Sequence, residues 1–217
     1  MQAAAMTPMR SIVMPALIAL AAGVLPAAVA AQDAARQQAS LSRAKGPKDA
    51  PVFVYEFADF QCPHCARFAV EVFPRLDSAY VKTGRVQWVF VNLPLPNHVN
   101  AWAAHEAAMC AGAVSDRFWP LHDRLFAGQT EWSKVDDPGE IFRRYARAAG
   151  VDAGAFDQCV AGDRVAPLLL QDVIFATSSR VNGTPAFIVD NQQSVMGLKS
   201  YEEWKTLLDA ALRAKRD

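Results

Sequence analysis

The chain has 217 residues, of which 52% are hydrophobic, and its 22 basic side chains balance its 22 acidic ones. This length suffices for one well-buried core with an inserted subdomain. The balanced charge, and the lack of a basic run or of interleaved basic and aromatic residues, argue against a nucleic-acid-binding protein, so no nucleic acid is expected as a partner.

Residues 1–31 differ in composition from the rest of the chain. Arg10 is their only charged residue, and residues 11–31 are apolar except for the serine that begins the run. An Ala-Val-Ala segment ending at Ala30 is typical of a signal-peptide cleavage site. We therefore predict a signal peptide over 1–31, cleaved near Ala30 or Ala31, and a periplasmic or otherwise exported protein. An uncleaved membrane anchor is the alternative, because the apolar run is nearly long enough to span a bilayer.

The next segments lead into a short cysteine motif. Residues 32–50 are polar, and we predict a tether or a short surface helix there. The apolar run from Pro51 to Ala58 predicts a strand, and Cys62-Pro63-His64-Cys65 follows it directly. A helix is expected from about Cys62 to Thr83, because its apolar residues recur on one face at helical spacing. Those residues are Phe68, Val72, Phe73, Leu76 and Tyr80.

Two cysteines three residues apart at the start of a helix form a strained disulfide that is easily reduced. The partial positive charge and free N–H groups of a helix N-terminus stabilise a thiolate on the first cysteine, Cys62. The thiolate is the species that attacks or leaves in disulfide exchange, so a redox enzyme is the leading interpretation. An inert disulfide between strand and helix is the alternative, although so short a loop constrains the unfolded chain little. A zinc ribbon would need a second such cysteine pair, which the sequence lacks.

The remaining elements alternate with turn residues. A buried strand is predicted from Val86 to Leu93, where prolines end it, and the chain is then helical from Asn97 to about Arg180. The expected helices are Ala101–Ala113, Ser115–Phe126, Pro138–Ala149, Ala153–Val160 and Val165–Ser179. Two short strands, Pro185–Asp190 and Ser194–Gly197, and a final helix complete the chain. One stripe of that helix is apolar and contains Tyr201, Trp204, Leu207, Leu208 and Leu212.

This order predicts an α/β fold around one mixed sheet. A β-α-β start and a β-β-α finish match the thioredoxin topology, with a helical insertion over about 97–180. The predicted domain covers residues 51–217. The strand after Pro185 would run antiparallel to the first strand, which brings its start close to the helix that begins at Cys62.

Two segments carry a resemblance to a known family. Phe57-Ala-Asp-Phe-Gln-Cys-Pro-His-Cys65 and Val181-Asn-Gly-Thr-Pro-Ala-Phe187, together with the helical insertion, resemble the DsbA family of thioredoxin-fold disulfide oxidoreductases. The resemblance implies an exported enzyme that introduces disulfides into client proteins by dithiol-disulfide exchange at Cys62 and Cys65. It also implies unfolded or reduced clients, a membrane partner of the DsbB type for reoxidation, and no metal or other cofactor.

The resemblance also assigns roles around the cysteine motif. Cys62 is expected to be the exposed nucleophile, and Cys65, one turn deeper, the buried resolving thiol. Pro63 and His64 are expected to tune the redox potential. The alternative for His64 is a solvent-exposed residue without a role in the chemistry.

Three more residues are implicated in the same way. Thr184-Pro185 resembles the cis-proline loop that faces the dithiol in this fold, and it would present its backbone to an extended client strand. Its alternative is an ordinary turn proline before a strand. Glu56 lies in the apolar strand before the motif, where a buried carboxyl with a raised pKa would take a proton from Cys65. A solvated edge residue is the alternative, and the sequence offers Glu56 no lysine partner on the next strand.

The other two cysteines, Cys110 and Cys159, lie within the helical insertion. We interpret them as a structural disulfide, because an exported chain with an even number of cysteines favours pairing. Two separate buried thiols are the alternative. His98, His105 and His122 share no spacing that would bracket a metal, so no metal site is predicted and they are expected to be surface helix residues.

Two other functions remain open. A disulfide reductase or isomerase would use the same fold with reversed electron flow, and in the family that the chain resembles, a threonine before this proline also occurs in reductive and isomerising relatives. The second is a copper-binding thioredoxin-like module, in which Met196 would add a soft ligand to the cysteine motif. The copper-carrying relatives usually have a longer cysteine spacing than Cys62 and Cys65, so the oxidase is the interpretation we carry forward.

Overall fold

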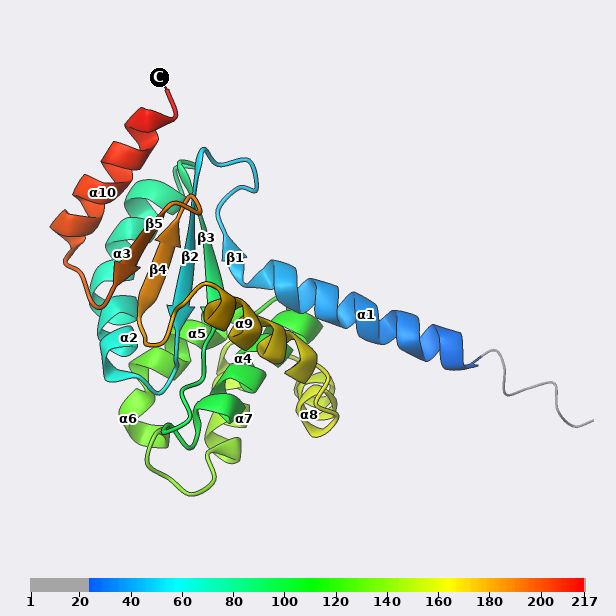
Figure 1. Ribbon diagram of the computed structural model, residues 1–217. Helices are drawn as coiled ribbons and strands as arrows, with labels where there is room; N and C mark the ends of the chain where they lie inside the picture. The colour runs from blue at the N-terminus through cyan, green and yellow to red at the C-terminus, as the bar shows by residue number, and fades with distance from the viewer. Residues whose placement is uncertain (1–23, 217) are drawn as a thin grey trace, which may run out of the picture.

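The computed structural model describes residues 24–216, which form a five-stranded mixed sheet surrounded by helices (Figure 1). The strand order is β1-β3-β2-β4-β5. The central β2 is parallel to β3 and antiparallel to β4, while β1 and β5 form antiparallel edges. The strands are β1 (Ala44–Lys45), β2 (Val52–Ala58), β3 (Val86–Asn92), β4 (Ala186–Val189) and β5 (Gln193–Met196). This arrangement confirms the predicted thioredoxin fold.

One face of the sheet is covered by the helical run that follows β2 and by α10 (Tyr201–Ala214) (Figure 1). The run continues from Pro63 to Val81 and consists of α2 (Pro63–Arg67), η1 (Phe68–Val72), α3 (Phe73–Leu76) and η2 (Asp77–Val81). The two η segments are π-helical, so the run is less regular than the single helix predicted from the sequence. Pro74 lacks the N–H that a regular helix needs at that position, which accounts for the interruption beside it.

Side chains alternate between the two faces of the sheet, as the pleat of a strand requires. Val52 and Val54 of β2 pack under α10 with the aromatic residues Phe68, Trp88 and Trp204. The opposite face is crossed by α9 (Ala166–Ser178) and holds a smaller cluster. The buried members of that cluster are Phe57, Val91, Leu93, Ala176, Val181 and Ala186.

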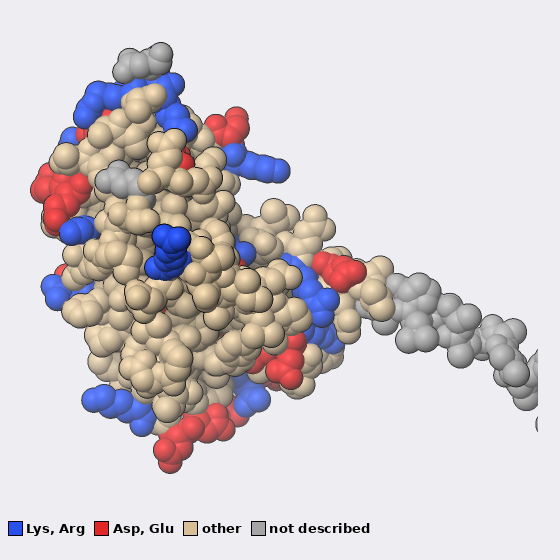
Figure 2. Space-filling view, viewed as in Figure 1, with Lys and Arg blue, Asp and Glu red and all other residues tan. Residues whose placement is uncertain are grey.

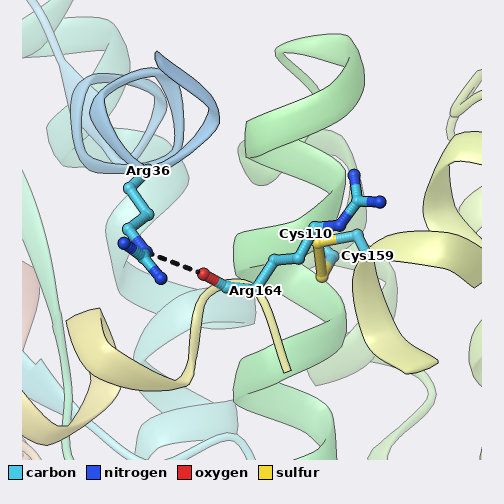
Figure 3. The surroundings of a disulfide bond; sticks show 4 residues. All are labelled: Arg36, Cys110, Cys159 and Arg164. Atoms are coloured by element: carbon cyan, nitrogen blue, oxygen red, sulfur yellow. Dashed lines mark hydrogen bonds between the residues drawn. A yellow bond between two sulfur atoms is a disulfide. The ribbon is translucent and has the colours of Figure 1, made fainter. Parts of the chain in front are cut away.

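The helical insertion forms a separate block below the sheet in Figure 1. It contains α4 (Ala101–Ser115), α5 (Phe118–Ala127), α6 (Gln129–Trp132), α7 (Gly139–Ala148) and α8 (Ala153–Ala161). A disulfide joins Cys110 of α4 to Cys159 of α8, with an S–S distance of 2.00 Å and a sequence separation of 49 residues (Figure 3). In the chain-entropy model, closing a loop of this length stabilises the fold by ~4 kcal/mol.

The segment before β2 is helical over residues 32–42, as one of the two predicted alternatives has it, but it is packed against the domain and is neither a tether nor a surface helix. Residues 32–50 include the C-terminal part of α1 (Val24–Ser42) and the strand β1. Ala39 is fully buried, and a Cβ placed on Gly112 of α4 would lie only 2.1 Å from the Ser42 Oγ. Arg36 Nε also donates to the Arg164 carbonyl at 3.1 Å (Figure 3). Small residues at the crossing of α1 and α4 permit this close packing, which a reading of polarity alone does not predict.

The predicted signal peptide falls largely outside the described residues. Residues 1–23 are not described, whereas Ala30 and Ala31 lie within α1. Between residues 24 and 216, no helix combines the length and the apolar character needed to cross a membrane.

The expectation that the histidines lie on surface helices is wrong. His105 and His122 are almost completely buried, and their Nδ1 atoms lie 2.8 Å from Asn92 Oδ1 and Asp123 Oδ1. Burial lowers the pKa of both side chains, that of His105 to about 4, because the charged form is poorly solvated there. Their partners and the surrounding phenylalanine rings allow neutral imidazoles in the core. No group of three or more potential metal ligands occurs within the described part of the chain.

Figure 2 shows a face of the molecule that is largely uncharged apart from a basic side chain near its centre, with most acidic and basic side chains near its margin. Helix α9 crosses the same view in Figure 1. Three of its large apolar side chains are solvent-accessible, with exposed fractions of 54% for Leu170, 67% for Ile174 and 37% for Phe175. This helix therefore presents an apolar outer surface.

Candidate active site

The cysteine motif begins where β2 ends and the helical run starts. Cys62 is the N-cap residue of α2, with an extended backbone (φ −74°, ψ 123°), and its carbonyl accepts a hydrogen bond from Ala66 N at 3.1 Å. This conformation places the Cys62 side chain at the open end of the helix, where backbone N–H groups lack intrahelical partners. Both Cys62 and Cys65 are free thiols in this structure.

Cys62 is less accessible than predicted. Its exposed fraction is 5%, and Cys65 is fully buried. The loop before β4 covers the nucleophile, because Cys62 Sγ donates to the Thr184 carbonyl at 3.5 Å. By contrast, Pro63 and His64 are exposed at the surface of the motif. A partner protein therefore has to reach Cys62 alongside the loop that contains Thr184.

The surroundings of Cys62 favour its thiolate. Its pKa falls from 9.0 to about 5, mainly because the Cys65 thiol donates a hydrogen bond to it. Burial opposes this shift, whereas the Thr184 side chain and the backbone N–H groups of Cys65 and His64 add to it. His64 therefore contributes through its backbone at the helix start.

Cys65 behaves in the opposite way. Burial raises its pKa well above 9.0, and the hydrogen bond to Cys62 and the negative charge there raise it further. One sulfur of the pair is thus stabilised as an anion and the other as a neutral thiol. This asymmetry gives the two cysteines different roles in exchange.

Thr184 and Pro185 lie opposite the motif and are joined by a cis peptide bond. Thr184 is half-buried and Pro185 is buried. The Pro185 carbonyl accepts a hydrogen bond from Gly197 N at 2.8 Å, which ties the loop to the end of β5. The two segments singled out in the sequence, far apart along the chain, therefore meet at Cys62 Sγ.

Glu56 is buried in β2, with an exposed fraction of 1%. Trp88 Nε1 donates to its Oε2 at 2.6 Å, and Oε1 accepts no hydrogen bond from the described residues. Burial raises the pKa of Glu56 from 4.5 to about 8, and the bond from Trp88 reduces the shift only partly. The partner of this carboxyl is therefore a neutral indole on β3, where the sequence offered no lysine.

Several side chains that support the motif from outside it were not predicted from the sequence. Asp59 is fully buried, and its carboxylate accepts hydrogen bonds from Gln61 N and Leu95 N, each at 2.7 Å. Its Oδ2 also lies 2.7 Å from His98 Nδ1. Gln129 of α6 donates to carbonyl groups within the dithiol loop. Apart from the local bond from Gln61 N, these contacts join residues 36 to 69 positions apart, so no local sequence pattern predicts them.

Comparison with known proteins decides the family. A family model described as thioredoxin matches residues 38–210, and a probable disulfide bond formation protein D from Bacillus cereus is 27% identical over 178 residues. That alignment covers 80% of this chain and 80% of the relative. The chain belongs to the thioredoxin family.

Solved structures show the same fold. The oxidised BdbD of Bacillus subtilis has a TM-score of 0.71 and 24% identity, covering 79% of this chain and 92% of that chain. The α-DsbA1 of Wolbachia pipientis has a TM-score of 0.69 and 20% identity, with coverage of 80% and 92%. The DsbA-like arrangement of sheet and helical block is thus common to these proteins and to this member of the thioredoxin family.

A further relative is much longer than this chain. The Na(+)/H(+) antiporter NhaA 3 of Salinispora tropica is 37% identical over 150 residues, which are 69% of this chain but 22% of the antiporter. This thioredoxin-family chain therefore spans about a fifth of the length of that relative.

Proposed function

We propose that this protein is an exported thiol oxidase, which introduces disulfides into client proteins by dithiol-disulfide exchange at Cys62 and Cys65. The observation that carries the proposal is the opposite ionisation of the two thiols: a pKa of about 5 at Cys62 and one well above 9.0 at Cys65. Stabilising the Cys62 thiolate stabilises the reduced enzyme, which makes its disulfide a stronger oxidant.

The reaction starts from the Cys62–Cys65 disulfide. A client thiolate attacks Cys62 Sγ, which forms a mixed disulfide and releases Cys65, whose sulfur takes up a proton. A second client thiolate then attacks the client sulfur of the mixed disulfide, and Cys62 leaves as a thiolate. The client loses two electrons and gains a disulfide, while the enzyme gains two electrons and becomes a dithiol. Electrons move between sulfur atoms only, so the exchange needs no cofactor or metal.

Glu56 provides a proton acceptor and donor inside the domain for the resolving cysteine. Its raised pKa of about 8 means that the buried carboxyl exchanges a proton near neutral pH. Cys65, fully buried, has little direct access to water for the proton it gains or loses. Glu56 therefore acts in proton transfer and takes no part in the bond exchange between sulfur atoms.

Thr184 and Pro185 form the surface against which the client lies. Their loop borders Cys62 Sγ at 3.5 Å, so an extended client strand beside the loop places its cysteine next to the nucleophile. Pairing with the Thr184 backbone would hold the client without regard to its side chains. That property suits an enzyme that acts on many unfolded or reduced proteins.

The remaining components of the cycle are inferred from the family. A membrane partner of the DsbB type would withdraw the two electrons and restore the Cys62–Cys65 disulfide. Export to the periplasm would follow from the apolar leader at residues 1–31. An oxidising compartment is also where a structural disulfide such as Cys110–Cys159 persists.

The direction of electron flow tests the proposal. We expect the oxidised protein, mixed with an equimolar reduced and unfolded client, to remove close to two client thiols for each enzyme disulfide, measured by thiol titration of the separated client. The reduced protein is expected to leave an oxidised client largely unchanged. Efficient reduction of the client disulfide, with little client oxidation, would instead identify a reductase.

A further inference from the structure

A glutamine of the helical block reaches into the dithiol loop. Gln129, in α6, is 9% exposed, and its Nε2 donates to the Phe60 carbonyl at 2.7 Å and to the Cys62 carbonyl at 3.0 Å. It is thus bonded to the nucleophilic residue itself and to a residue two positions before it. Both of these bonds go to carbonyl oxygens and neither goes to a sulfur, and neither the family resemblance nor the cysteine motif assigns Gln129 a role.

The peptide bond after Cys62 offers few groups through which hydrogen bonds can hold it in place. Its nitrogen belongs to Pro63 and carries no hydrogen, so the Cys62 carbonyl is the only hydrogen-bonding group of that peptide. The carbonyl accepts from two donors, Ala66 N at 3.1 Å within the helix and Gln129 Nε2 from outside it. Gln129 is therefore the one external group that we find holding this peptide among the described residues.

The two neighbouring amide side chains anchor the same region. Gln61 Nε2 donates to the Ser133 carbonyl at 2.8 Å, and Gln61 Oε1 accepts from Asn100 N at 2.8 Å. Asn100 Nδ2 in turn donates to the carbonyls of Trp132 and Val135 at 3.1 and 2.8 Å. These bonds fix the chain around α6 relative to the dithiol loop, so the amide of Gln129 approaches Cys62 from a held position.

We propose that Gln129 is a positioning residue for the nucleophile: it orients the Cys62 peptide so that the helix N–H groups face the sulfur, and it thereby stabilises the thiolate. Two physical effects combine. A fixed Cys62 backbone keeps Sγ in line with the N–H groups of His64 and Cys65. The amide hydrogens also offset the negative end of the Cys62 carbonyl dipole, which would otherwise repel a neighbouring anion. The helical block thus takes part in setting the reactivity of the dithiol.

The test compares Gln129→Met with the wild-type protein. Methionine keeps the length of the side chain and removes both donors, so we expect the acid dissociation constant of Cys62 to fall about fivefold, the equivalent of one net hydrogen bond. The readouts are the absorbance of the thiolate at 240 nm as a function of pH and the redox potential against glutathione. The loss of thiolate stabilisation should make the disulfide less oxidising by about 20 mV.

Two further variants sharpen the result. Gln129→Glu replaces the donor by an acceptor that repels both carbonyls and the thiolate, so its effect should exceed that of Gln129→Met in the same direction. Gln129→Asn keeps the amide but shortens its reach. It takes the place of either variant that fails to fold. Gln192→Met is the matched control, since Gln192 is exposed in the turn after β4, at the end of the sheet away from the motif.

A folded Gln129 variant with unchanged Cys62 ionisation and unchanged potential would overturn the proposal, as would an equal shift in Gln192→Met. The proposal rests on dithiol exchange at Cys62 but not on its direction. If the wild-type potential identified a reductase, the proposed oxidase function would fail, while a Gln129-dependent shift in Cys62 ionisation would still stand.

Discussion

Cys62→Ser is expected to abolish client oxidation, to below ~0.1% of the wild-type rate, because no other sulfur of the motif is both reachable and stabilised as a thiolate. Cys65 is fully buried and holds its proton, and Cys110 and Cys159 are bonded to each other. The rate is measured as loss of client thiols in the presence of an external oxidant that regenerates the enzyme disulfide.

Cys65→Ser is the matched variant, with a different expected outcome. Its remaining thiolate at Cys62 should attack a client cysteine activated as an aryl mixed disulfide, release the aryl thiolate, and stop at an enzyme–client disulfide. Non-reducing electrophoresis and peptide mapping identify the sulfur in that complex. A complex formed through Cys65 in the Cys62→Ser variant would contradict the assignment of the nucleophile.

Glu56→Gln is expected to change the pH dependence of the free energy of unfolding strongly. The pKa of Glu56 is raised from 4.5 to about 8, so the folded state binds a proton that the unfolded state releases between these values. The resulting stability is fully present below pH 4.5 and is lost as pH rises through about 8. The free energy of unfolding lost over this pH range through Glu56 is about 5 kcal/mol, which corresponds to the full shift of its pKa.

Glutamine does not titrate, so the stability of Glu56→Gln relative to the parent protein should increase as pH rises from 4.5 to 8. Urea unfolding at several pH values measures this, with Cys62→Ser and Cys65→Ser present in both proteins so that the thiols do not titrate. Trp88→Phe removes the hydrogen bond that partly lowers the Glu56 pKa, so it should move the transition to higher pH. A difference between Glu56→Gln and its parent that does not vary with pH would mean that Glu56 is ionised in the folded protein.

Local sequence signals predicted the parts of the fold that depend on local physics. The strands from Pro51 and Val86 are runs of β-branched and aromatic residues, and they form β2 and β3 at the centre of the sheet. The dithiol at the start of a helix is likewise a local feature, because strand, turn and cap are consecutive. The disulfide between Cys110 and Cys159 followed from counting cysteines, and the structure places a bond there.

The features that the sequence did not predict depend on contacts between distant segments. Trp88 becomes the partner of Glu56 only because β2 and β3 pair in parallel with Val54 opposite Trp88. Polarity suggested a tether or a surface helix before β2, but close packing at Gly112 makes that segment part of the domain. The burial of His105 likewise depends on a partner, Asn92, that lies on another element.

The redox potential of the Cys62–Cys65 pair tests the central claim most directly. Purified protein lacking residues 1–31 is equilibrated with glutathione buffers, and the fraction of dithiol is measured by alkylation and mass spectrometry. A Cys62 thiolate stabilised to a pKa of about 5 predicts a potential well above about −200 mV, as expected of an oxidase. A value near −270 mV, about that of thioredoxin, would contradict the account and indicate a reductase supplied with electrons by another protein.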